Sequence, residues 1–68
     1  MELSARNQLK GTVKEVNLGM ITASIKIEVD DPNIITAVIT KESAEKLGLK
    51  EGDDVQAIIK STEIIVGK

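Results

Sequence analysis

The sequence predicts an all-β protein, a small barrel of five short strands with one short helix between the third and fourth strands. Three observations predict this class. Apolar and polar residues alternate along residues 21–29, as in a strand with one buried face. Glycine, proline, asparagine and aspartate divide the other β-branched runs into short segments. Helix-forming residues are gathered in one stretch after Thr40 that is long enough for about two turns.

The first three strands are expected before this helix. A strand is predicted over residues 7–16, where apolar residues and a glycine alternate with polar ones, and Gly19 marks the following turn. The clearest strand, Ile21 to Val29, is apolar at every odd position. Asp30-Asp31-Pro32-Asn33 is a turn because proline cannot donate to a ladder. The third strand, Ile34 to Thr40, has apolar residues on both faces, which suggests that another subunit covers its outer face.

The helix is expected to begin at Thr40 as N-cap and to end at Gly48 as the left-handed residue that follows it. Lys50-Glu51-Gly52-Asp53 forms a tight turn into a fourth strand, Val55 to Ser61, and a fifth strand runs from Glu63 to Val66. This order fits a closed or nearly closed OB-like barrel, in which closure removes exposed strand edges. No repeat or linker interrupts the chain, so residues 1–68 are expected to form a single domain.

A chain of 68 residues has a marginal core of its own, because a domain of this size buries only about 60% of the surface that it exposes when unfolded. Small domains compensate with disulfides, a structural metal or partner subunits. The sequence contains no cysteine and no histidine. Oligomerisation is therefore the expected means of stabilisation.

Composition also excludes several classes of function. The absence of cysteine and histidine removes thiol catalysis, the usual nucleophilic triads and zinc sites. The carboxylate pairs Asp30-Asp31 and Asp53-Asp54 lie in predicted turns, and the isolated glycines form no phosphate-binding motif, so we expect a protein that is not an enzyme. The net charge of −2 and the lack of any aromatic residue argue against a nucleic-acid partner. No signal peptide or membrane span is predicted, and a cytoplasmic location is expected.

Short hydroxyl and cationic side chains at the ends of the predicted elements are the candidate binding groups. They are Ser4, Arg6, Thr40, Ser43, Lys60 and Ser61. Each has an ordinary structural explanation as a cap, a turn or a solvated charge. If they converge, however, two cations balance a tetrahedral dianion, and hydroxyls together with the N–H groups at a helix start supply donors from several directions.

Three segments resemble molbindins, the small proteins built from the molybdate-binding Mop domain. The most specific is the opening Ser4-Ala5-Arg6-Asn7-Gln8-Leu9-Lys10-Gly11-Thr12-Val13. Ala37 to Ser43 and Leu47 to Thr62 resemble the family's middle and closing segments in the same order. The likeness spans nearly the full chain, and the chain has the length of one free-standing Mop domain.

This resemblance implies an OB-like barrel that dimerises by exchanging a strand, with three dimers forming a hexamer. It implies binding of molybdate or tungstate at subunit interfaces for intracellular storage, buffering or homeostasis, with no turnover and no organic cofactor. One class of pocket would take Ser4, Arg6, Lys60 and Ser61 from one subunit and Thr40 and Ser43 from its neighbour. A second class, near the threefold axis, would include Asn7. Molybdenum would be held as an oxyanion, without direct metal ligation.

Two alternatives remain open from the sequence. Residues 47–53, Leu-Gly-Leu-Lys-Glu-Gly-Asp, also occur in small swapped-hairpin DNA-binding transcriptional regulators. Such proteins need a basic face for phosphates, whereas this chain is net acidic. A structural or RNA-binding OB module is the second alternative, and the absence of aromatic residues weighs against it.

Overall fold

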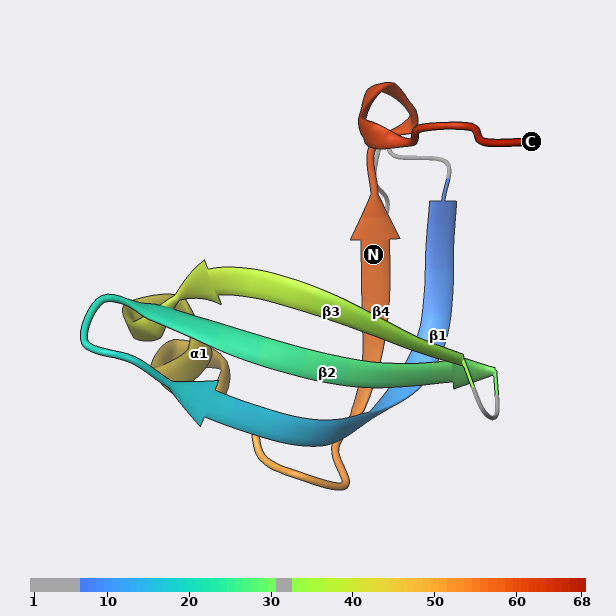
Figure 1. The fold of residues 1–68 in the computed structure, drawn as a ribbon. Coiled ribbons are helices and arrows are strands. Elements are labelled where there is room, and N and C mark those ends of the chain that lie inside the picture. The colour runs from blue at the N-terminus through green and yellow to red at the C-terminus, as the bar shows by residue number, and fades with distance from the viewer. Residues whose placement is uncertain (1–6, 31–32) are drawn as a thin grey trace.

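The computed structural model describes residues 7–30 and 33–68, which are mostly β (Figure 1). The elements are β1 (Asn7–Leu18), β2 (Thr22–Asp30), β3 (Asn33–Thr40), α1 (Lys41–Leu47), β4 (Asp54–Ile59) and the 3-10 turn η1 (Ser61–Glu63). The four strands form one antiparallel sheet in the order β3-β2-β1-β4. The β class and the single short helix between the third and fourth strands are confirmed.

Strand β1 has a different neighbour along each half of its length. Residues 7–12 pair with β4, and residues 12–18 pair with β2. The pairing with β2 is irregular between Val13 and Glu15, and an extra residue of this kind bends and twists a strand. In Figure 1 the first half of β1 and β4 accordingly stand together at a steep angle to β2 and β3. We call the paired residues 7–12 and 54–59 the β1–β4 arm.

The core is small and entirely aliphatic. On β2, Ala23, Ile25 and Ile27 are buried while Lys26 between them is exposed, so the alternation predicted from the sequence is confirmed. The buried residues come from β1, β2, α1 and β4, and they are Val13, Ala23, Ile25, Ile27, Ala44 and Ala57. Of the four strands and the helix, β3 alone contributes no buried side chain, and it packs beside the others with half-buried ones.

Both predicted ends of helix α1 are confirmed. The Thr40 hydroxyl oxygen accepts a hydrogen bond from the Ser43 backbone N–H at 3.0 Å, as an N-cap does. Gly48 is left-handed at φ 62°, and its N–H donates to carbonyl oxygens of the last turn. Ala44 faces inward, and the Leu49 N–H donates to its carbonyl at 3.2 Å. The helix therefore lies against the sheet through a small side chain.

The turn predicted at residues 50–53 is also confirmed, and it joins α1 to the β1–β4 arm. The Asp53 N–H donates to the Lys50 carbonyl at 3.1 Å, and the Lys50 N–H donates to an Asp53 carboxylate oxygen at 2.9 Å. Gly52 takes the positive φ of 96° that the turn requires. Two further bonds connect Val13 to the turn, Val13 N–H to Asp53 carbonyl and Gly52 N–H to Val13 carbonyl.

The predicted fifth strand, Glu63 to Val66, is wrong. Strand β4 ends at Ile59, Ser61–Glu63 form a 3-10 turn, and the residues after it have no regular structure. Ile65 and Val66 are 94% and 88% exposed. β-branched composition indicates a fit to a half-buried pleated surface, and among residues 7–30 and 33–68 no neighbouring strand offers residues 63–66 such a surface.

The predicted barrel closure is not found in a single chain. Strands β3 and β4 are the two edges of the sheet, and in the ranges 7–30 and 33–68 they do not pair with each other. The expectation that β3 is apolar on both sides is confirmed. Its inner residues Ile35, Ala37 and Ile39 pack on the core, while Ile34 and Val38 on the other face are exposed.

Candidate oxyanion-binding site

Lys60 and Ser61 lie at the free end of the β1–β4 arm. Asn7, the first residue of β1, is paired with Ile59, the last residue of β4, so that Lys60 follows the final pair of the ladder. Lys60 keeps an extended backbone, φ −67° and ψ 137°, and precedes η1. Both Lys60 and Ser61 are exposed. Ser4 and Arg6, the other predicted groups of this half-site, lie outside the described residues.

The Lys60 ammonium group is available, whereas two other lysines of the sheet are engaged. Lys14 and Lys26 form cross-strand ion pairs with Glu28 and Glu15 at 3.4 and 3.3 Å. Within the described part of the chain, Lys60 forms no such pair. Exposed pairs of this kind contribute little stability, but each places a carboxylate beside its lysine. An anion would meet an uncompensated positive charge at Lys60.

Thr40 and Ser43 form a small hydroxyl cluster where β3 passes into α1. The Thr40 hydroxyl donates to Ser43 Oγ at 2.8 Å, and its oxygen accepts the Ser43 N–H. The Thr40 proton and acceptor are thereby used within the chain, while the Ser43 hydroxyl accepts one bond and keeps its own proton to donate. Both side chains are exposed. The cluster can therefore offer a neutral donor to a group outside the chain.

The structure does not bring the two predicted half-sites together within one chain. In Figure 1, η1, which follows Lys60, lies at the tip of the β1–β4 arm. Helix α1 lies at the end of the β2–β3 hairpin that is away from the arm. A site that uses both Lys60 and Thr40 therefore needs a second copy of the chain. The expectation that Lys60 and Thr40 come from different subunits stays a prediction.

Asn7 lies at the same end of the arm as Lys60. Its side-chain Nδ2 donates to the Ile59 carbonyl at 3.3 Å, and the residue is half-buried. No pattern in the sequence indicates this hydrogen bond, because the register of the β1–β4 pairing, which places Asn7 opposite Ile59, is decided by the tertiary fold.

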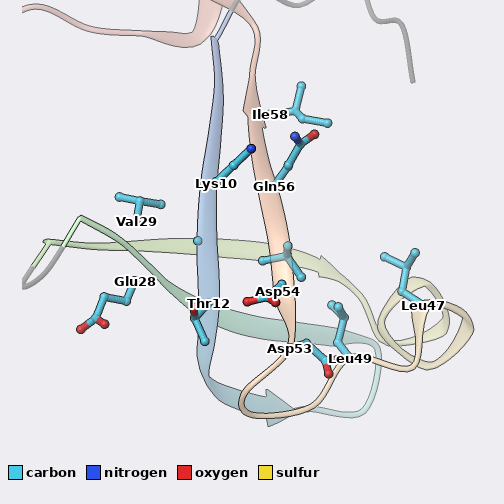
Figure 2. A pocket seen from close by; sticks show the side chains of 12 residues that line it. Lys10, Thr12, Glu28, Val29, Leu47, Leu49, Asp53, Asp54, Gln56 and Ile58 are labelled. Carbon is cyan, nitrogen blue, oxygen red and sulfur yellow. The ribbon is translucent and has the colours of Figure 1, made fainter.

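A groove of about 980 Å³ lies elsewhere, beside the β1–β4 arm (Figure 2). Among the lining residues that the structure describes, Lys10 is the one cation, whereas Glu28, Asp53 and Asp54 contribute carboxylates. Its apolar wall includes Leu47 and Leu49. A dianion would be repelled by the carboxylates, so the groove does not suit an oxyanion.

A second pocket, of about 360 Å³, is lined mainly by aliphatic side chains of the core, and none of its described lining residues is charged. Such a lining cannot replace the hydration of a dianion. In the described ranges no cluster of carboxylates could hold a metal ion. No helix in this part of the chain is both long and apolar enough to cross a membrane. The half-sites at Lys60 and at Thr40 therefore remain the candidate anion-binding groups.

Comparison with known proteins agrees with this chemistry. Residues 3–66 match the family described as the TOBE domain. The chain is 47% identical over 66 residues to molybdenum-pterin-binding protein 1 of Clostridium pasteurianum, and the alignment covers 97% of each chain.

Two solved structures are similar over most of this chain. A molybdate binding protein from Sporomusa ovata superposes with a TM-score of 0.94 at 40% identity, covering 100% of both chains. The cytoplasmic molybdate-binding protein ModG, in a form with molybdate bound, superposes with a TM-score of 0.85 at 41% identity, covering 90% of this chain and 43% of the other. These similarities favour the oxyanion-binding interpretation over a swapped-hairpin DNA-binding regulator. The chain belongs to the TOBE-domain family, as a molbindin-like member of the molybdenum-pterin-binding (Mop) proteins.

Proposed function

We propose that this protein binds molybdate or tungstate as intact oxyanions between subunits, and that it stores or buffers them in the cytoplasm without chemical turnover. The observation that carries the proposal is that the hydroxyl cluster and Lys60 lie far apart in the fold. The cluster lies where β3 passes into α1, and Lys60 lies at the free end of the β1–β4 arm. Each chain thereby offers two complementary half-sites to its neighbours. The molybdate-bound ModG structure and the molybdate binding protein of Sporomusa ovata support the choice of ligand.

The proposed pocket combines two cations with several neutral donors. Ser4, Arg6, Lys60 and Ser61 would come from one subunit, and Thr40 and Ser43 from another. A charge-assisted hydrogen bond contributes about 1.5–3 kcal/mol net. Five or six of them could offset desolvation of the anion and leave binding near −8 kcal/mol, which is about micromolar.

The sequence has no cysteine or histidine to displace the oxygens of the anion, so the metal keeps its oxygen shell. Molybdate and tungstate carry the same charge as sulfate on a larger frame. The proposed pocket would therefore select by size. Asn7 is proposed to line a second class of pocket near a threefold axis.

The proposed assembly is a dimer formed by strand exchange, three of which make a hexamer. Among residues 7–30 and 33–68, nothing pairs with the outer edges of β3 and β4, and an unpaired edge is a template for another strand. Large apolar side chains are also exposed at several places in the chain, including Met20, Val38, Leu47 and Ile65. A fifth strand formed across the dimer would give the closing segment the neighbour that it lacks alone.

Calorimetric titration tests the proposed ligand. Molybdate and tungstate should each bind with measurable heat, at fewer than two anions per chain, and sulfate should bind more weakly. Protein concentration has to be measured by peptide absorbance, because the sequence contains no aromatic residue. Flat titrations with both molybdate and tungstate would refute the proposed function.

The cations of the pocket are tested by Lys60→Ala and Arg6→Ala. Each variant removes one positive charge and should abolish binding at the interfacial sites while leaving the oligomer intact. Lys50→Ala is the matched control, because Lys50 is an exposed lysine whose hydrogen bonds to Asp53 in the turn are made by its backbone. Normal molybdate binding by both site variants would show that the assigned site is wrong, even with the ligand correct.

A further inference from the structure

The first residue of β1 holds the last residue of β4. Asn7 and Ile59 are the terminal pair of the β1–β4 ladder, and Asn7 Nδ2 donates to the Ile59 carbonyl at 3.3 Å. The bond joins residues far apart in the sequence and is half-buried. It thus ties the start of one strand to the carbonyl that immediately precedes Lys60.

Beyond this bond the backbone has few constraints. The Glu63 N–H donates to the Lys60 carbonyl at 2.9 Å, and the Ile64 N–H donates to the Ser61 carbonyl at 3.4 Å, both within η1. Among the described residues no side chain caps η1, whose own residues are exposed. The direction in which Lys60 leaves the arm therefore depends on how firmly Ile59 is held.

We propose that Asn7 is a positioning residue for the oxyanion site: it fixes the end of β4 and thereby aims Lys60 and Ser61, without needing to contact the anion. This inference rests on the proposed function of Lys60 and Ser61. An amide suits the task because it donates to a carbonyl without adding a negative charge near a bound dianion. Aspartate in its place would have only acceptors to face the Ile59 carbonyl once ionised.

Asn7→Ala should weaken molybdate binding by about two- to tenfold, the change that corresponds to one net hydrogen bond. In the ligand-free protein, backbone ¹⁵N order parameters at Lys60 and Ser61 should fall, while those at Val13 in the core stay unchanged. The thermal midpoint should change little. The number of anions bound at the interfacial sites should stay as in the wild type, because Lys60, Ser61 and the other groups proposed for those sites remain present.

Asn17→Ala is the matched control. Asn17 lies on the same strand, and its side chain also donates a hydrogen bond, but to the exposed Glu15 carboxylate at 2.8 Å and far along β1 from Ile59. It should bind molybdate as the wild type does. Weakened binding by Asn7→Ala with this control unaffected supports the positioning role.

Three results would overturn the inference. Unchanged affinity in Asn7→Ala would remove any role in binding. Weaker affinity with unchanged order parameters at Lys60 and Ser61 would make Asn7 a direct ligand. Order parameters that fall throughout the chain would indicate a role in stability alone. If the wild type binds no molybdate, the proposed function fails separately, and the ligand-free order parameters still decide whether Asn7 holds the end of β4.

Discussion

At Gly11 the backbones of β1 and β2 come closer than a side chain permits. A Cβ on Gly11 would lie 2.6 Å from Ile27 Cγ2 and 2.7 Å from the Glu28 carbonyl oxygen. The position is just before Thr12, which pairs with both β2 and β4. Glycine is therefore needed where the pairing of β1 changes from β4 to β2, and it allows the β1–β4 arm to bend away from β2 and β3.

Gly11→Ala should destabilise the protein by about 1–3 kcal/mol, as overpacking in a core does. The backbone oxygen of Glu28 cannot rotate away, so β1 and β2 would have to separate. Chemical denaturation followed by far-ultraviolet circular dichroism measures the loss. Gly67→Ala is the control, since nothing lies within 4 Å of its Cβ position. Equal stability of the two variants would contradict the close approach at Gly11.

At the scale of elements, α1 depends on its ends. A helix of seven residues is too short to be stable in isolation. Thr40 supplies the N-cap, Gly48 the left-handed end, and Ala44 the buried contact. Thr40 also belongs to the proposed anion site, where its hydroxyl donates to the Ser43 hydroxyl, so its two roles need to be separated.

Two substitutions of Thr40 separate capping from binding. Thr40→Ala removes the cap and should cost about 0.5–2 kcal/mol of unfolding free energy, and it should also weaken molybdate binding. Thr40→Asp keeps a capping oxygen and should retain most of the stability, but its carboxylate would face the anion and should abolish binding. Denaturation and calorimetry report the two effects. Thr36→Ala, an exposed threonine of the same strand, is the control. Unchanged binding by Thr40→Asp would exclude Thr40 from the site.

For the whole molecule, the exposed apolar surface and the open edges predict that folding and assembly are coupled. Val38 on the edge strand β3 is 69% exposed, and the proposed oligomer would cover part of this surface. Stability of an obligate oligomer depends on protein concentration. The thermal midpoint of this protein should accordingly rise as its concentration is raised.

Val38→Asp should shift the population to smaller species, because a charge buried in an apolar contact is strongly unfavourable. Native mass spectrometry with and without molybdate reports subunit number and bound anions together, and a hexamer is expected for the wild type. Asn17→Asp adds the same charge at an exposed polar position and should leave assembly unchanged. A monomeric wild type at all concentrations would contradict the proposed assembly.

Local features of the sequence were sufficient to predict most of the strands and the helix. Alternation identified β2, and Thr40 and Gly48 marked both ends of α1, because caps and period-two burial depend on a few adjacent residues. The same local signals failed at Glu63 to Val66, where the β-branched residues have no neighbouring strand in the described part of the chain.

The sequence alone determined the chemistry of the candidate site: cations and hydroxyls with no cysteine, histidine or aromatic residue. Only the tertiary structure decided which groups are neighbours. The register that joins Asn7 to Ile59 and the bend that parts Lys60 from Thr40 depend on contacts between residues distant in sequence. Strand pairing is non-local, so no pattern along the chain can encode which carbonyl an amide will meet.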